Sequence, residues 1–406
     1  MGANKLALAG GSVGNTLGKN LGAKDEKGVI GTRQLCFFVA FLLPVSKLLE
    51  TPSVLAYYAK GDLLFPAICQ QLLQALAIGL FLFLSARTDK SFFELIESGL
   101  GRIAAKIIYI ALAVYFVFYS LLPLLEFERF VYTAFFDAAP TFSAFLPFFL
   151  MSAYVCTKGL KAFARSADLA MPLFIVSFVG LMVMSVGESD FSAVLPLFGT
   201  PISSSFKGFL RSMIHFSDSA LLLPMLGAYR YKKGDGKKVM GSYALGSFFV
   251  LFFLVVFYGL FGPLSPIMTF AFDKTAQYFK ALNTVGRIDL MLAYTMTILL
   301  IFYYCLPLQL GVICFSRAVE TNKKIPVAAA LNLALLLFTA YFAKFYTRIY
   351  NFVTYYSFWV FPVFAYLLPL FALFLVLKNR GKRMNGGGMS ESDKKTARKE
   401  DGYATC

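Results

Sequence analysis

The chain has 406 residues, of which 58% are hydrophobic and 15% are charged, whereas a soluble domain has about 25% charged residues. Packed cores could not hide this much apolar surface, so the composition predicts that lipid surrounds most of the chain. Inside lipid every backbone N–H and C=O group needs a partner, which only helices and closed barrels provide. The apolar runs are too long for barrel strands. The sequence therefore predicts an all-α, polytopic membrane protein and excludes a soluble enzyme.

The net charge of +16 does not indicate a nucleic-acid partner. Most of the charges lie in short connections between apolar runs, as they do in the loops of membrane proteins. The six cysteines include no Cys-x-x-Cys pair, and His215 is the only histidine. We therefore expect no disulfide framework, no metal site and no cofactor.

Taken in chain order, residues 1–30 are Gly-rich and polar and contain no continuous apolar stretch. They predict a flexible cytoplasmic tail rather than a cleavable signal peptide. Residues 31–378 are expected to form a transmembrane domain, and residues 379–406 a basic, disordered cytoplasmic tail. The connections 188–205 and 263–287 are long enough to hold short surface helices, although simple connectors fit equally well.

About 20 apolar residues suffice for one helix to cross the hydrocarbon of a bilayer, and ten segments of the domain meet this requirement approximately. Their expected spans are 33–58, 62–86, 103–134, 140–157, 166–187, 206–229, 239–262, 288–316, 325–343 and 350–377. The tails and connections on one side of these segments carry 28 Lys and Arg residues, against 7 on the other side. Because Lys and Arg concentrate on the cytoplasmic side, both termini are predicted to be cytoplasmic.

The first segment is interrupted by charged residues and prolines. Pro44 and Pro52 each remove a backbone N–H and clash with the preceding turn, so a broken or kinked helix is expected between them. Lys47 and Glu50 are three residues apart and would share one face of a helix, which permits an internal ion pair. Ionisable groups at this depth are costly and normally face a protein interior or a water-filled cavity.

The sixth segment carries a polar stripe. Arg211, His215 and Asp218 follow one another at helical spacing, with Ser217 beside them. If the helix unwinds near Ser217, the freed backbone groups could coordinate a ligand, as in discontinuous transporter helices. A self-satisfied network that only packs the bundle remains the alternative.

A third group of charges, Glu126, Glu128 and Arg129, lies near the end of the third segment. At 1.5 Å per residue from Ile103, these residues stand roughly 35–40 Å along a straight helix. We expect them to be solvated at the outer interface.

Several short motifs indicate a family when they are taken together. They are Gly31-Thr-Arg33-Gln34-Leu, Thr51-Pro52-Ser53, Phe93-Glu94-Leu-Ile-Glu97, Leu100-Gly101-Arg102, Lys158-Gly159-Leu160-Lys161-Ala-Phe-Ala-Arg165-Ser-Ala-Asp168 and Leu195-Pro196-Leu197. The most specific is Gly159-Leu160 followed by Ala164-Arg165 and a helix that contains Pro172. With these motifs the chain resembles the endospore germination permeases, the B-type subunits of nutrient germinant receptors, which are similar to the amino acid/polyamine/organocation transporters.

The resemblance covers roughly residues 30–378. It implies an inverted five-plus-five repeat of ten helices, with helices 1 and 6 discontinuous at a central substrate site. It also implies an A-type membrane subunit and a C-type lipoprotein as partners, an integral location in the spore inner membrane, and the sensing of germinants such as amino acids. One departure is evident, because Val45-Ser46-Lys47 stands where relatives carry small residues. We hypothesise that the Lys47 ammonium reaches Asp218 or Glu50 and occupies part of the pocket.

Together these observations predict a permease-like germinant receptor subunit and not an enzyme. It would bind, and possibly transport, a small polar nutrient between the first, third, sixth and eighth segments and thereby trigger germination. The expected substrate-binding residues are Ser46, Lys47, Glu50, Arg211, His215, Ser217, Asp218, Tyr294 and Thr295, with Thr297 or Tyr303 as further contributors. Three alternatives remain: a proton-coupled amino acid permease without a receptor role, a polytopic membrane enzyme, and a structural assembly subunit.

Overall fold

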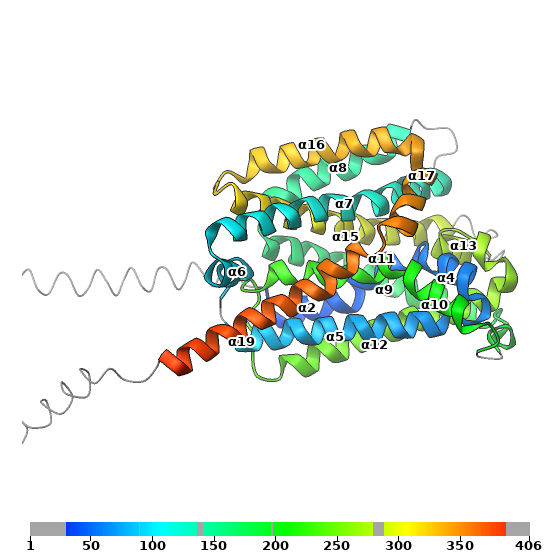
Figure 1. The fold of residues 1–406 in the computed structure, drawn as a ribbon. Helices are drawn as coiled ribbons and strands as arrows, with labels where there is room; N and C mark the ends of the chain where they lie inside the picture. Colours follow the sequence, from blue (N-terminus) through cyan, green and yellow to red (C-terminus); the bar gives the residue numbers. More distant parts are fainter. Residues whose placement is uncertain (1–29, 89, 136–140, 196–197, 279–287, 387–406) are drawn as a thin grey trace, which may run out of the picture.

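The computed structural model describes residues 30–88, 90–135, 141–195, 198–278 and 288–386. Within these residues the chain is helical, apart from turns and two isolated β-bridges. Long helices lie side by side in one bundle (Figure 1). They are α5 (Leu64–Arg87), α7 (Arg102–Phe135), α8 (Thr141–Thr157), α9 (Leu160–Val186), α12 (Asp235–Phe261), α15 (Ile288–Ala318), α16 (Lys324–Phe342) and α19 (Leu368–Gly386).

Eight of the ten predicted segments correspond to candidate membrane spans among the described residues. Among the described residues, seven helices are long and apolar enough to cross a membrane, and the bent pair Thr32–Leu48 with Thr51–Asp62 makes an eighth. The other two segments are α8, which has 17 residues, and residues 202–225, where the helix is interrupted. At the C-terminal end of the last span, α19 continues beyond the predicted boundary at Lys378 to Gly386.

The first span is broken where its prolines predict a break. It consists of α2 (Thr32–Phe37), a π-helical turn, α3 (Leu43–Val45) and a 3-10 turn that ends at Leu48. The chain then bends by 61° before α4 (Thr51–Ala59). Pro52 lies in the first turn of α4, where a proline is tolerated because no helical N–H is needed there. The bend leaves Glu50 between the two halves of the span, directly before α4.

The sixth span is also interrupted, as predicted. It contains α10 (Ile202–Arg211), α11 (Met213–Phe216) and two 3-10 turns, Ser217–Leu221 and Leu223–Met225. The α-helical hydrogen bonding therefore ends at Phe216 and gives way to a 3-10 pattern from Ser217 onward.

The tenth span has a break that the sequence analysis did not anticipate. It consists of α17 (Tyr346–Asn351), a π-helical turn, a bend at 357–359, α18 (Val360–Pro362) and, after another π-helical turn, α19. Pro362 accounts for the bend, because its ring excludes the carbonyl oxygen four residues earlier and it offers no N–H. The predicted segment 350–377 is thus two helices rather than one.

The connections that were predicted to be cytoplasmic gather at one end of the bundle. The Asp235 carboxylate accepts hydrogen bonds from the hydroxyl groups of Thr32 (2.8 Å) and Tyr229 (2.7 Å). At the same end lies α6 (Phe92–Leu100), which begins at a capping box of Ser91 and Glu94. Figure 1 shows α6 at this end and α4, α10, α13 (Ala271–Tyr278) and α17 at the other.

One crossing in the bundle requires glycine. Gly246 of α12 lies against the backbone of Ala40, in the π-helical turn of the first span. A Cβ atom at position 246 would clash with the carbonyl oxygen of Ala40 and lie 2.9 Å from its carbonyl carbon. Only a residue without a side chain lets the two backbones approach this closely.

At the opposite end, Asp62 joins the end of the first span to the connection that leads into α10. Its carboxylate accepts hydrogen bonds from the backbone N–H groups of Phe198 (2.5 Å) and Thr200 (2.6 Å), and from the Thr200 hydroxyl. We expect Asp62→Asn to destabilise the chain by about 1–3 kcal/mol, because the amide has a single acceptor oxygen and no charge, whereas the two carboxylate oxygens accept from three donors. Thermal unfolding and limited proteolysis of the connection would measure the loss.

Asp190→Asn is the matched control for Asp62. The Asp190 side chain is exposed at the other end of the same connection and accepts hydrogen bonds from the adjacent Ser192. If both variants unfold at the same temperature, Asp62 does not hold the connection.

Candidate functional site

A buried ion pair lies at the junction of the broken spans. The Lys47 ammonium and the Asp218 carboxylate are 2.5 Å apart, and the exposed fractions of their side chains are 2% and 0%. The second carboxylate oxygen accepts hydrogen bonds from the Tyr303 hydroxyl (2.5 Å) and the Tyr119 hydroxyl. Lys47 also donates to the backbone oxygen of Leu43 at 3.3 Å. A charge pair survives burial only when such partners satisfy both ions.

Four different spans supply this cluster of Lys47, Asp218, Tyr119 and Tyr303. Lys47 belongs to the 3-10 turn before the bend of the first span, and Asp218 to the unwound part of the sixth. Tyr119 and Tyr303 lie on α7 and α15, the third and eighth spans. These are the four spans between which the sequence analysis predicts that the nutrient binds, and the resemblance implies the site at the first and sixth of them. The Lys47 ammonium was hypothesised to reach Asp218 or Glu50. In the structure it pairs with Asp218 and forms no ion pair with Glu50.

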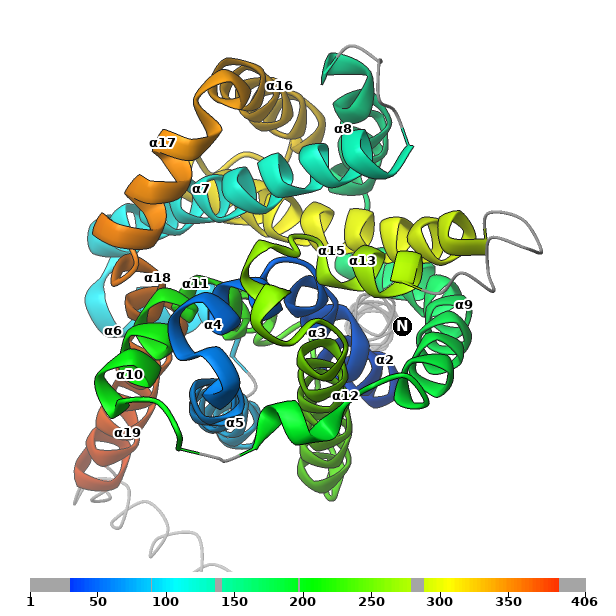
Figure 2. The ribbon, with the colours of Figure 1, turned by 90° about the vertical axis from the view of Figure 1, so that its right-hand side faces the viewer.

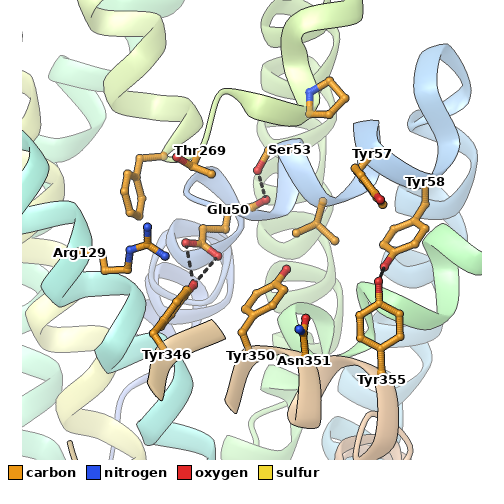
Figure 3. Close-up of a pocket in the computed structure, with 13 residues that line it drawn as sticks. Glu50, Ser53, Tyr57, Tyr58, Arg129, Thr269, Tyr346, Tyr350, Asn351 and Tyr355 are labelled. Atoms are coloured by element: carbon orange, nitrogen blue, oxygen red, sulfur yellow. Dashed lines mark hydrogen bonds between the residues drawn. The ribbon is translucent and has the colours of Figure 1, made fainter. Parts of the chain in front are cut away.

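A cavity of about 280 Å³ opens on the other side of the bend in the first span (Figure 3). It lies toward the end of the bundle opposite α6, which the distribution of Lys and Arg predicts to be the outer end. Side chains from the first, third and tenth spans and from the connection after α12 line it. They are Glu50, Ser53, Val54, Tyr57, Tyr58, Arg129, Pro266, Thr269, Phe270, Tyr346, Tyr350, Asn351 and Tyr355.

Opposite charges lie on the wall of this cavity. The Glu50 carboxylate accepts from the Tyr346 hydroxyl at 3.3 and 3.4 Å. The Arg129 guanidinium lies over the ring of Tyr346, 4.5 Å from its centroid. Glu50 and Arg129 form no ion pair within 4.0 Å, so each charge can serve a ligand. A cavity with a carboxylate, a guanidinium and several tyrosine hydroxyls suits a small ligand that carries both a cation and an anion.

The expectation that the charges of the third segment are solvated is wrong for two of the three. Glu126 is 4% exposed and Glu128 is 7% exposed, whereas Arg129 is exposed and lines the cavity. One carboxylate oxygen of Glu126 has no hydrogen-bond partner, and Glu50 is a neighbouring carboxyl group. α15 and α17 pack against α7, and the ring of Tyr304 lies against that of Phe127 in this part of it. A length measured along one straight helix does not reveal this packing.

The polar stripe predicted for the sixth segment is divided by its breaks. Arg211 donates to the backbone oxygen of Thr354 at 2.7 Å and stacks on the ring of Tyr355, so it contacts the tenth span. His215 is buried beside the ion pair. Ser217 donates to the backbone oxygen of Met213, within its own span.

The remaining predicted site residues contribute less to the two sites. The Ser46 hydroxyl donates to the backbone oxygen of Leu43 at 3.4 Å. Tyr294 is 56% exposed, and Thr295 is buried with its hydroxyl on the oxygen of Leu292. Neither Tyr294 nor Thr295 lines the cavity. On α15 it is Tyr303, a residue named only as a further contributor, that reaches the ion pair.

Sequence reasoning missed Tyr119 and Tyr346 and assigned Arg129 to the solvated interface. The chain has 22 tyrosines, and no local pattern distinguishes the two that bond Asp218 and Glu50. Arg129 did carry a signal, because an arginine near the end of an apolar segment is costly unless the protein uses or satisfies it.

In the described part of the chain, no three His, Cys, Asp or Glu side chains gather as a metal site would require.

Similar proteins support the fold and the family. Three crystal structures of mutants of the Eremococcus coleocola manganese transporter match with TM-scores of 0.54, 0.53 and 0.53, each at 12% identity over 85% of this chain and 78% of that one. Likeness at this identity concerns the fold alone, and it confirms the predicted transporter fold with discontinuous helices 1 and 6.

No curated protein sequence matches the chain closely enough to count as a relative. The model of one family, described as spore germination protein, matches residues 35–350. This range contains the first span from Leu35 onward, the ion pair, Arg129 and Tyr346. The chain therefore belongs to the spore germination protein family of membrane permeases.

Proposed function

We propose that this membrane protein is the permease-like subunit of a nutrient germinant receptor, and that it binds a small nutrient such as an amino acid in the cavity between Glu50 and Arg129. The observation that carries the proposal is this pair of opposite, unpaired charges beside the bend of the first span. An ammonium group would pair with Glu50, and a carboxylate would pair with the Arg129 guanidinium, which can donate two parallel hydrogen bonds. The tyrosines on the wall supply apolar area and further hydroxyl groups.

The ion pair of Lys47 and Asp218 would act as the barrier beneath the ligand. It fills the junction between the cavity and the α6 end. A ligand that binds more tightly to one arrangement of the broken spans shifts the population toward that arrangement. In the spore inner membrane, with both termini in the cytoplasm, an A-type membrane subunit and a C-type lipoprotein would receive this shift and trigger germination.

Thermal stabilisation of the purified chain by a panel of amino acids and sugars tests the proposal. A ligand at 100 times its Kd should stabilise the chain by about 2.7 kcal/mol. Glu50→Gln and Arg129→Gln should each weaken binding by about tenfold to a hundredfold, since hydrogen bonds to charged groups contribute about 1.5–3 kcal/mol.

Lys344→Gln is the control for this experiment, because Lys344 is exposed and lies outside the cavity wall. If a ligand stabilises all four proteins equally, it does not bind between Glu50 and Arg129. If no member of the panel stabilises the wild-type chain, the nutrient-binding role fails for those classes of ligand.

A proton-coupled amino acid permease without a receptor role is the second candidate. The buried carboxyl group of Glu126, with one unpartnered oxygen beside Glu50, favours it, because two adjacent buried carboxyl groups readily share a proton. Proteoliposomes that are more acidic outside than inside would then accumulate the amino acid, because inward proton flow drives the uptake. Glu126→Gln would abolish this uptake. Ligand binding without any net uptake would favour the receptor.

A further inference from the structure

A second cavity, separate from the nutrient cavity, opens on the flank of the bundle. Its volume is about 950 Å³, and it lies between α7, the end of α16 and the bent tenth span. Figure 2 shows α16, α17 and α7 next to one another. Exposed side chains such as Val114, Phe118 and Phe352 line it, so in a membrane its opening faces hydrocarbon. We call this cavity the flank cleft.

The flank cleft is almost entirely apolar, with one cation at its edge. Arg348 lines it and is exposed. The Arg348 guanidinium lies over the ring of Phe345 at 5.9 Å, and it forms no ion pair with a described carboxylate. Arg348 belongs to α17, at the end of the bundle where the polar headgroups of the outer leaflet are expected. An uncompensated arginine at this depth attracts a phosphate.

We propose that the flank cleft binds an acyl chain of an anionic phospholipid, whose phosphate pairs with Arg348. The size of the cleft favours a lipid chain over a transmembrane helix of a partner. Along α7 the cleft extends from Ala111 to Leu121, about 15 Å at 1.5 Å per residue. A partner helix is about 10–12 Å wide and crosses about 30 Å of hydrocarbon, so its groove would continue along the whole span.

The floor of the flank cleft connects it to the buried ion pair. Tyr115 lines the cleft, and its ring stacks on that of Phe364 with centroids 4.3 Å apart. The rings of Tyr115 and Phe361 lie 5.7 and 6.1 Å from the ring of Tyr119, which bonds Asp218. An acyl chain in the cleft therefore packs against the rings that position a donor of the ion-pair cluster.

Native mass spectrometry of the full chain tests the site with phosphatidylglycerol and phosphatidylcholine of identical acyl chains as probes. We expect one phosphatidylglycerol to remain bound to the wild-type chain. We expect its affinity to exceed that of phosphatidylcholine by about fivefold, the effect of one arginine at an anionic membrane surface. Val114→Trp should project an indole into the cleft, obstruct the path of the acyl chain and release the lipid, and Arg348→Gln should make the two affinities equal.

Ile107→Trp is the matched control for bulk, because Ile107 is exposed on α7, about one turn before the cleft, and does not line it. The proposal is wrong if Val114→Trp and Ile107→Trp retain the same number of lipids, or if Arg348→Gln keeps the preference for phosphatidylglycerol. If Val114→Trp instead prevents co-purification of an A-type subunit and leaves the lipid count unchanged, the cleft binds a protein and the lipid assignment is overturned.

Discussion

Lys47→Met is expected to destabilise the folded chain by about 3–5 kcal/mol, the cost of leaving a buried charge without its partner. The substitution keeps an unbranched stem of four atoms and removes the ammonium group that lies 2.5 Å from the Asp218 carboxylate. Tyr119 and Tyr303 would still donate to Asp218, but hydrogen bonds from two hydroxyl groups do not replace a cation. Thermal unfolding of the purified chain in detergent would measure the effect.

Two further variants decide whether the loss comes from the ion pair. Lys47→Met combined with Asp218→Asn should recover most of the stability, because replacing both ions by neutral groups of similar volume is often close to neutral. Lys344→Met removes an exposed cation and should change the stability by less than about 0.5 kcal/mol. Should Lys47→Met unfold at the same temperature as Lys344→Met, the ion pair does not hold the broken spans together.

Gly246→Ala is the second substitution with a large expected effect. Its Cβ atom would collide with the backbone of Ala40, and a backbone atom cannot move aside as a flexible side chain can. We expect a loss of about 3 kcal/mol, the upper end of the usual cost of overpacking. Thermal unfolding and the yield of monodisperse protein would report it.

Gly241→Ala gives the opposite expectation on the same helix. A Cβ atom at Gly241 would have no heavy atom within 4 Å, and alanine forms helix better than glycine by about 1 kcal/mol. The two substitutions are chemically identical and should change stability in opposite directions. If both stabilise the chain, the contact between α12 and Ala40 is looser than described.

The topology could be predicted because hydropathy and charge act locally. Each span needs a long apolar run, and the positions of Lys and Arg fix the alternation of the connections. The break in the first span was also readable, since Pro44 and Pro52 flank the charged residues Lys47 and Glu50 within one apolar run. A proline alone is a weaker signal, because Pro123, Pro172 and Pro307 each lie inside a continuous helix. Pro362 accounts for the break in the tenth span. This break was not predicted, because the residues around Pro362 form one long apolar run, which is typical of a single helix.

The side-chain partners could not be predicted with equal success, because the breaks change which residues share a face. Lys47 and Glu50 are neighbours only on an unbroken helix, and the 61° bend places one in the ion pair and the other in the cavity. In the same way, the interruptions of the sixth span separate Arg211 from Asp218. Arg211 contacts the tenth span, whereas Asp218 pairs with Lys47. Contacts such as those of Tyr119, Tyr346 and Glu126 depend on the packing of distant segments, which no local spacing encodes.

The hydrogen bonds of the Asp62 carboxylate affect how α4 and α10 can move relative to each other. By accepting hydrogen bonds from Phe198 and Thr200 it connects the end of the first span, after α4, to the connection that leads into α10, and α4 and α10 also pack against each other. We therefore expect the two segments to move together, with hinges at Leu49 and Ser212, where the regular helices end. Any joint tilt of α4 and α10 would therefore widen or narrow the mouth of the cavity beside Tyr57 and Tyr58.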